Sequence, residues 1–413
     1  MAIKLEYQNG LRAVIEESGA HSVSAGIWIN AGSRKENAAN NGISHFIEHM
    51  IFKGTDKLCA QEIAESFESR GAAVNAFTSK DCTCYYFKSL KDKAEECFSL
   101  LSHIFLDSVF PKVELDRERN VIVEELNMTE DSPEDVCFDM LADAIYDGTL
   151  ARPIIGTEEN ILRFEKTDID AYKDSNYCPE NIVVSFAGGI TAKTADRLIR
   201  EYFLPRLPAA KRCDGEEKNG YKLVKSVRID DKFEQSNLML GFRSIEFNHK
   251  NSATQSVLNM LFGGGMSSRL FQKVREEMGL AYSVYTAPSV YVGAGAFLVC
   301  VNYSAANTGK VLTCVRGEID KLVSGGATAG EIEKAKMQLK TAMVFNQENS
   351  QSQMLSLGKL MLLGDELYDM DKKLREVDEV SVASVNKFAQ NLFAGVPALA
   401  YLGKKPDVEP EWN

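Results

Sequence analysis

The order of strand-like and helix-like segments runs through this 413-residue chain twice, and no other feature limits its fold as strongly. His49–Thr55 (HMIFKGT) aligns with Asn259–Gly265 (NMLFGGG), 210 residues later (259 − 49). Glu68–Gly71 (ESRG) matches Glu276–Gly279 (EEMG), 208 residues later (276 − 68). Self-similarity at a nearly constant spacing indicates a duplicated unit, the alternative being coincidental helix ends with glycine stops. We therefore expect an α+β fold of two homologous domains.

The predicted elements follow the same order in both halves, with strands first and helices after them. In the first half we expect strands over 3–7, 11–17, 22–29 and 182–188, an extended stretch over 73–88, and helices near 42–53, 60–70, 91–107, 112–130, 134–147 and 191–203. In the second half we expect strands near 222–229, 235–243 and 398–403, an extended stretch over 281–302, and helices near 251–262, 267–277 and in four further segments up to about 394. Residues 205–221 concentrate proline, glycine and charge, as a linker would. The predicted domains are therefore 1–204 and 222–413, joined by the linker 205–221.

The composition is typical of a folded protein and excludes several classes of function. Apolar residues make up 45% and charged residues 26% of the chain. The formal net charge of -12 opposes binding to nucleic acid, because such binding relies on neutralising phosphates. No segment has the roughly 18 uninterrupted apolar residues of a membrane span, and the amino terminus lacks the apolar core of a signal peptide. We therefore expect a cytoplasmic protein without nucleic-acid or membrane partners.

Nine cysteines are scattered through the chain without a repeated spacing, and an odd number cannot all pair within one chain. Reduced thiols are therefore the simpler interpretation. Cys82 and Cys84 lie in an alternating stretch, so both side chains are expected on one face of a strand. We interpret them as buried strand cysteines, with metal or redox chemistry as the alternative.

A His-x-x-Glu-His motif lies within residues 42–52, which have helical spacing. Residues four apart sit one turn above each other, so His45 and His49 can present their imidazole nitrogens to one zinc ion. Glu48 lies on nearly the same face, where its carboxylate can serve as general base towards an attacking water. The alternative is a structural or adventitious zinc site.

The ends of this helix and its duplicate in the second half add two expectations. Asn40 or Asn41 is the predicted N-cap, and Gly54 is the predicted stop. In the second half, the residues aligned with the motif are Gln255, Leu258 and Asn259. Only the first half therefore keeps metal-binding side chains.

Catalytic zinc needs a third protein ligand, and the predicted helix over 115–128 offers three carboxylates. At about 100° per residue, Glu118 and Glu125 lie two turns apart beside the apolar face, whereas Glu124 points roughly 100° away from Glu125. A buried ionised carboxylate is costly unless it is paired or metal-bound. We assign Glu125 as the third ligand and Glu118 as an acceptor that orients a histidine.

Four stretches extend the resemblance to known proteins beyond one motif: residues 45–55 (HFIEHMIFKGT), 75–79 (NAFTS), 118–125 (ERNVIVEE) and 263–283 (GGGMSSRLFQKVREEMGLAYS). His-x-x-Glu-His is the inverzincin pattern. The chain resembles the pitrilysin family of zinc metallopeptidases essentially from end to end, and most closely the bacterial relatives of the mitochondrial processing peptidase β-subunit. The resemblance implies two homologous domains, each a mostly antiparallel sheet covered by helices, of which only the first is catalytic.

The resemblance also implies roles for residues in both halves. It agrees with zinc ligands at His45, His49 and Glu125, a base at Glu48 and a supporting carboxylate at Glu118. Arg275 and Tyr282 match positions that hold the substrate; without the family they would be interpreted as surface and strand residues. Asn75, Ala76 and Phe77 match an edge strand that pairs with extended peptide, the alternative being a plain core strand.

The function that follows is zinc-dependent endopeptidase activity on short or unfolded polypeptides held in extended form. Family members that close a chamber with one chain carry four repeats, so this two-repeat chain is expected to form a homodimer, or a heterodimer with an inactive relative. The alternatives are a non-catalytic scaffold subunit and a metal-dependent hydrolase of non-peptide substrates. Gly263–Gly265 lacks a following Gly-Lys-Ser/Thr, so we interpret it as a helix stop or cleft loop and not as a phosphate site.

Overall fold

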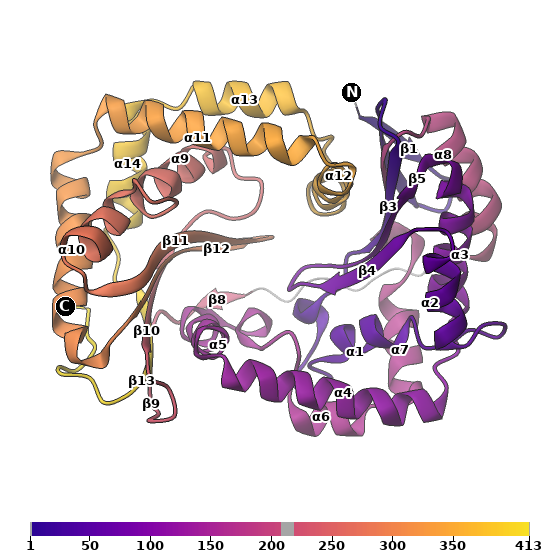
Figure 1. Cartoon of the computed structure of the whole chain (residues 1–413), viewed down its shortest axis with the longest axis horizontal. Helices are drawn as coiled ribbons and strands as arrows, with labels where there is room; N and C mark the ends of the chain where they lie inside the picture. The colour runs from indigo at the N-terminus through magenta and orange to yellow at the C-terminus, as the bar shows by residue number, and fades with distance from the viewer. Residues whose placement is uncertain (1, 208–218, 413) are drawn as a thin grey trace. The chain divides into compact units, whose positions relative to one another are not determined.

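The computed structural model describes residues 2–207 and 219–412, which divide into two units (Figure 1). Unit 1 comprises Met1–Leu126, Pro153–Glu217 and Val344–Asp369, and unit 2 comprises Asn127–Arg152, Lys218–Met343 and Met370–Asn413. Each unit has its own sheet and its own hydrophobic core. The predicted α+β fold class is confirmed. Residues 208–218 of the predicted linker lie outside the described residues.

The sheet of unit 1 has six strands. In spatial order they are β1 (Ile3–Glu6), β2 (Arg12–Glu17), β7 (Ile182–Gly188), β3 (Ser22–Ile29), β5 (Thr83–Leu90) and β4 (Ala73–Thr78). β2 and β7 are parallel, and the other neighbouring pairs are antiparallel. Because β4 ends this order, one of its edges has no strand partner among the described residues.

The central strand β3 is buried on both of its faces. Val23, Ala25 and Ile27 belong to the main core cluster of unit 1, whereas Trp28 belongs to a second cluster on the opposite face. The main cluster is covered by α1 (Ile43–Met50), α2 (Ala60–Glu68), α3 (Ala94–Asp107), α4 (Lys112–Asp131), α6 (Glu158–Arg163), α7 (Lys166–Asn176) and α8 (Ala192–Leu198). The helix layer that carries the predicted metal ligands therefore rests on one face of this sheet.

The opposite face of the sheet is covered by helix α12 (Ser350–Gly364), which comes from far along the chain. Met354 and Leu357 of α12 pack in one cluster with Trp28. Gly358 lies directly against the indole ring, because a Cβ added there would be 2.0 Å from Nε1 of Trp28. The close approach of this helix to the sheet therefore requires glycine.

Replacing Gly358 with alanine is expected to lower the free energy of unfolding by about 1–3 kcal/mol, because the added methyl group overpacks the contact with Trp28. Gly317 in α10 (Thr308–Gly325) is the matched control, since a Cβ there meets no atom within 4 Å. G317A is expected to stabilise by up to about 1 kcal/mol, because alanine favours a helix over glycine. Urea unfolding followed by circular dichroism measures both; equal effects would contradict overpacking at Gly358.

The sheet of unit 2 repeats the strand order of unit 1, without a counterpart of β1. Its strands are β11 (Ala281–Tyr291), β12 (Ala294–Tyr303), β10 (Ser236–Arg243), β13 (Ala398–Gly403) and β9 (Lys225–Ile229); β6 (Tyr146–Asp147) and β8 (Gly220–Tyr221) form a separate small pair. β13 and β9 are parallel, as β7 and β2 are in unit 1. One face is covered by α9 (Ser252–Phe262), α10, α11 (Ala329–Gln347), α13 (Met370–Asp378) and α14 (Val382–Leu392). The shared topology supports the predicted duplication.

The two units differ from the contiguous halves 1–204 and 222–413 that we predicted. Asn127–Arg152, which contains α5 (Pro133–Ile145), belongs to unit 2, and Val344–Asp369, which contains α12, belongs to unit 1. The physical reason is that each central sheet is apolar on both faces and needs a helix layer on each side. In unit 2 that second layer is α5, whose apolar side chains pack on β10 and β13.

The structure also bears on the predicted elements and on the cysteines. Residues 158–176, for which we predicted no element, form α6 and α7. No helix within the described part of the chain is long and apolar enough to cross a membrane. Seven cysteines in the described part of the chain are free thiols. Cys82 and Cys84 are buried in one cluster as predicted, with Cys84 on β5 and Cys82 directly before it. Cys178 is disulfide-bonded, so the expectation of reduced thiols is wrong for this residue.

Candidate metal centre

Helix α1 carries three of the predicted site residues on one side and part of the core on the other. Phe46 and Met50 are buried in the main cluster of unit 1, which fixes the helix on the sheet. His45, Glu48 and His49 follow the complementary spacing and are less deeply buried. The local pattern of apolar and polar residues thus sets the direction in which the two imidazoles point.

Helix α4 supplies the two carboxylates that face α1. Glu118 and Glu125 are seven residues apart, which places them two turns apart on one side of the helix. Leu115 and Ile122 are buried in the core and hold α4 in place. The side chain of Glu118 is 4% exposed and that of Glu125 is 45% exposed. Both carboxylates reach the histidines of α1.

The three predicted metal ligands come together in unit 1. Nε2 of His45 lies 3.7 Å from Oε1 of Glu125, and Nε2 of His49 lies 3.4 Å from Oε2 of Glu125. One ligand atom from each of the three residues falls within 4.8 Å of the others. Within the described residues, this is the one group of at least three histidine, cysteine or acidic side chains with that property.

The geometry of this group fits a zinc ion. Two ligands bound tetrahedrally at about 2.0–2.1 Å are about 3.3 Å apart, which is close to both measured separations. Two imidazoles and one carboxylate form a ligand set found in catalytic zinc sites, with one position left open. The remaining ring nitrogen of His45, Nδ1, is buried and has no hydrogen-bond partner among the described residues, which distinguishes it from His49.

Glu118 orients His49 and is itself held by a cation. Nδ1–H of His49 donates to Oε1 of Glu118 at 2.9 Å, which leaves Nε2 for a metal. The ammonium of Lys53 lies 2.7 Å from the second oxygen of Glu118. Burial raises the pKa of Glu118, but the bonds from His49 and Lys53 outweigh it, and the net pKa is lowered. The carboxylate is therefore ionised and fixed at both oxygens.

The two histidines differ in their electrostatic surroundings. Burial and the neighbouring His49 lower the pKa of His45. Burial alone would also lower the pKa of His49, but its bonds to Glu118 and Glu125 raise it to about 9. The hydrogen bond to His49 is also the main cause of the lowered pKa of Glu125.

Replacing Glu118 with glutamine is expected to lower zinc affinity by about 10–100-fold, because the residue that orients a metal-binding histidine loses its charge. Competition with a chromophoric chelator measures the dissociation constant. Glu114 is the control, since it lies on the same helix and pairs with Arg117, away from the two histidines. Equal zinc affinity in E118Q and E114Q would contradict the assigned role.

Glu48 lies beside the three predicted metal ligands, His45, His49 and Glu125, which we call the metal group. It is held by the end of β4. The hydroxyl of Thr78 donates to Oε2 of Glu48 at 2.6 Å. Burial raises the pKa of Glu48, and the hydrogen bond from Thr78 opposes that rise. A carboxyl group whose pKa is raised towards neutrality is suited to accepting and returning a proton. Asn75, Ala76 and Phe77 lie on this same strand, which is an edge strand as predicted.

Arg275 and Tyr282 belong to unit 2, whereas all of the metal-group residues belong to unit 1. The guanidinium of Arg275 lies 5.6 Å from the ring centre of Tyr282, and Tyr282 is 77% exposed. The structure thus brings these two residues together on the surface of unit 2, and their role towards a substrate stays a prediction. In the same unit, Asn259, the counterpart of His49, accepts a hydrogen bond from Thr286 at 2.8 Å. That position forms a polar contact in place of a metal ligand.

Comparison with known proteins decides the family. The sequence model of the insulinase family, peptidase family M16, matches residues 12–158, and that of the M16 inactive domain matches residues 163–339. The uncharacterized zinc protease YmxG of Bacillus subtilis is 39% identical, over 96% of this chain and 96% of that protein. This chain belongs to peptidase family M16. An uncharacterized zinc protease of Mycobacterium leprae is 34% identical, over 95% of the M16 chain and 90% of the relative.

Solved structures share the fold of this M16 chain. A protease from Helicobacter pylori is similar with a TM-score of 0.90 and 21% identity, over 98% of this chain and 99% of that one. A protein from Pseudomonas fluorescens described as a peptidase M16 inactive domain has a TM-score of 0.89 and 21% identity, over 99% of both chains. The resemblance to the pitrilysin family that we drew from sequence is therefore confirmed for family and fold.

Two residues of the M16 site were not singled out from the sequence. Lys53 holds Glu118, and Thr78 holds Glu48. Lys53 lies inside the stretch 45–55 that carries the family resemblance, three residues beyond the end of α1 at Met50. Thr78 follows the edge-strand residues directly, but its partner lies 30 residues away in sequence. Only the packing of α1 on β4 brings that pair together.

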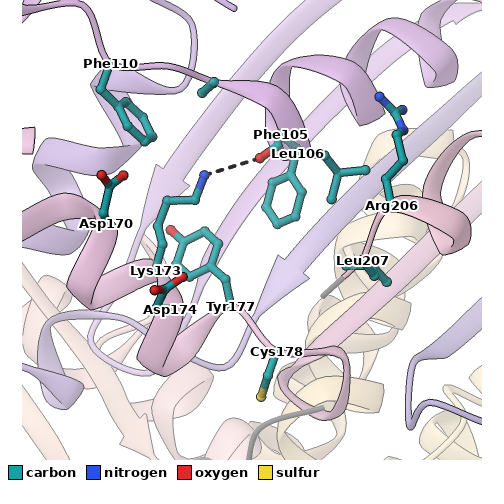
Figure 2. Close-up of a pocket in the computed structure, with 11 residues that line it drawn as sticks. Phe105, Leu106, Phe110, Asp170, Lys173, Asp174, Tyr177, Cys178, Arg206 and Leu207 are labelled. Atoms are coloured by element: carbon teal, nitrogen blue, oxygen red, sulfur yellow. Dashed lines mark hydrogen bonds between the residues drawn. The ribbon is translucent and has the colours of Figure 1, made fainter. Parts of the chain in front are cut away.

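A cavity of about 410 Å³ elsewhere in unit 1 is a second place to look for function (Figure 2). It is lined by the ends of α3 and α7, and its walls include Phe105, Phe110 and Tyr177. The ammonium of Lys173 donates to the carbonyl oxygen of Phe105 at 3.5 Å and lies 4.9 Å from the ring centre of Phe110. Burial lowers the pKa of Lys173 to about 8. The described lining residues include none of His45, His49, Glu48 and Glu125, so this cavity is separate from the candidate metal centre.

Proposed function

We propose that this M16 chain is a zinc-dependent endopeptidase that hydrolyses peptide bonds in short or unfolded polypeptides held in extended form. The observation that carries the proposal is the convergence of His45, His49 and Glu125 at separations that fit zinc, with Glu48 beside them. The zinc proteases among the curated relatives support the choice of metal and reaction. A scaffold subunit would have no need for this set of side chains.

Each residue of the site has a separate role in the proposed reaction. When bound, zinc supplies a Lewis acid for the scissile carbonyl and for the attacking water. Glu48 accepts the proton of that water and delivers it to the leaving amine. Thr78 holds Oε2 of Glu48 and so limits the movement of this carboxylate. His45, His49 and Glu125 hold the ion, and Glu118 with Lys53 keeps His49 in its orientation.

The free edge of β4 suits a substrate in extended form. A peptide that adds to this edge makes main-chain hydrogen bonds, which depend little on sequence. Because β4 ends at Thr78, which contacts Glu48, a peptide bound along the strand passes next to the proposed base. Contact of Arg275 and Tyr282 with the substrate, and assembly as a homodimer or with an inactive relative, are further predictions of the same proposal.

Cleavage of a pool of unstructured peptides tests the proposed function. We expect internal cleavage that stops after treatment with a zinc chelator and returns when zinc is added back, measured by mass spectrometry of the products. A folded protein of similar composition is the control and is expected to stay intact. Cleavage that resists the chelator, or wild-type protein that holds stoichiometric zinc but cleaves no peptide, would contradict the proposal.

A further inference from the structure

The start of helix α1 has an unusual solution for its unpaired backbone N–H groups. The first N–H groups of a helix need acceptors from outside it, and a serine, threonine, asparagine or aspartate at the N-cap commonly provides one. Here the N-cap is Gly42, not Asn40 or Asn41 as predicted, and no side chain at that position accepts a bond. Gly42 has φ 99, and an added Cβ would be 2.6 Å from the carbonyl oxygen of Ile155. A side-chain cap at this position is therefore excluded.

The acceptor comes instead from Glu36, six residues before the N-cap. The N–H of Gly42 donates to Oε2 of Glu36 at 2.8 Å, and the N–H of Ser44 donates to Oε1 at 2.8 Å. The side-chain amide of Asn41 donates to Oε2 at 2.9 Å. Each carboxylate oxygen is thus committed to the first turn of the helix that carries the proposed ligands.

Glu36 is 2% exposed, and these bonds offset part of the cost of burying its carboxyl group. Burial raises the pKa of this carboxyl, and the bonds from Gly42 and Ser44 oppose the rise. Two further hydrogen bonds hold Asn41, which lies directly before the N-cap. Asn41 donates to the carbonyl oxygen of Pro153 at 2.9 Å, and Asn160 donates to that of Asn41 at 3.1 Å.

The residue that donates the second backbone hydrogen bond to Glu36, Ser44, comes immediately before the first proposed ligand. His45 follows Ser44 directly, and α1 has only eight residues, so a shift of its first turn moves His45 and tilts His49. Metal ligation tolerates errors of only about 0.2 Å in ligand distances. A carboxylate that holds the first turn therefore acts on the spacing between the imidazoles and Glu125.

We propose that Glu36 is a positioning residue for the metal centre, acting through the N-terminus of α1. It contacts neither metal nor substrate, and its effect is on where His45 and His49 lie. The inference rests on the proposed zinc function for its meaning, but its test uses metal binding in the absence of any substrate. A protein that binds zinc and fails to cleave peptides would contradict the proposed function and leave this inference intact.

The test compares E36Q and E36A with wild type. E36Q keeps the size of the side chain and one acceptor oxygen, so it remains informative if E36A does not fold. We expect zinc affinity, measured by chelator competition, to fall by about 10–100-fold in E36A and less in E36Q. The visible absorption spectrum of the cobalt-substituted protein is expected to change with it, because that spectrum follows ligand geometry.

Two controls separate positioning from general loss of stability. Glu62 accepts the N–H of Cys59 at 2.8 Å at the start of α2, a helix without site residues, so E62A removes a helix cap of the same unit. G358A destabilises the same unit through α12. Both are expected to keep wild-type zinc affinity and spectrum. Wild-type values in folded E36Q and E36A, or an equal loss in either control, would overturn the proposal.

Discussion

Glu48→Gln is expected to leave zinc content unchanged and to reduce peptidase turnover by about 10²–10⁴-fold, the usual contribution of a general base. Glutamine has nearly the same shape but cannot take a proton from the attacking water. The hydrogen bond from Thr78 can still be accepted by the amide oxygen, so the side chain keeps its place. Initial rates on a fluorogenic peptide and metal analysis of the same sample give the two quantities.

The matched control for E48Q is Glu124→Gln. Glu124 is an exposed carboxylate next to the proposed ligand Glu125, and its change removes the same charge from the region without touching the reacting atoms. We expect E124Q to turn over peptide at the wild-type rate. Unchanged turnover in E48Q would remove Glu48 from the mechanism, and loss of zinc in E48Q would place it in the metal shell.

Glu125→Ala is expected to abolish stoichiometric zinc binding. Binding free energies of about 10–16 kcal/mol for four-ligand structural zinc correspond to roughly 2.5–4 kcal/mol per ligand, or about 10²–10³-fold in affinity. Removing Glu125 takes away the carboxylate that lies 3.7 Å from His45 and 3.4 Å from His49. Metal analysis after dialysis against a weak chelator measures the loss.

Glu124→Ala provides the comparison for this second variant as well, because the two residues are adjacent on α4 and only Glu125 approaches the histidines. E124A is expected to keep zinc at the wild-type level. Circular dichroism of both variants excludes a loss that comes from unfolding. Full zinc content in E125A with loss in E124A would reverse the assignment of the third ligand.

Each part of the metal group was accessible from sequence because helix geometry relates residues within one helix. His45 and His49 are one turn apart, and the choice of Glu125 over Glu124 needs only the angle per residue and the position of the apolar face. The capping carboxylate of Glu36 was not accessible in this way. Its bonds to Gly42 and Ser44 depend on how the loop over 36–42 closes, and the sequence offered two asparagines that looked like better caps.

The sequence of β3 contains one sign that the two units are not contiguous halves of the chain. Along β3, Val23, Ala25 and Ile27 form one face, and the alternate set is Ser22, Ser24, Gly26 and Trp28. The two serines are typical of a face towards solvent, and only the large apolar Trp28 indicated that this face also needs cover. Neither α5 nor α12 could be assigned to a sheet from its own periodicity. That assignment depends on contacts over more than 300 residues, such as the 3.0 Å bond between Ser24 and Ser350.

The late position of α12 in the chain has a consequence for synthesis on the ribosome. All strands of the unit 1 sheet have been translated by residue 188, but the helix that covers its second face is complete only at residue 364. At about 5–20 residues per second, the nascent chain carries this uncovered apolar face for roughly 10–35 s. Unit 1 therefore cannot finish folding before residues 344–369 have been translated. Its exposed sheet is the surface that a ribosome-associated chaperone would have to protect.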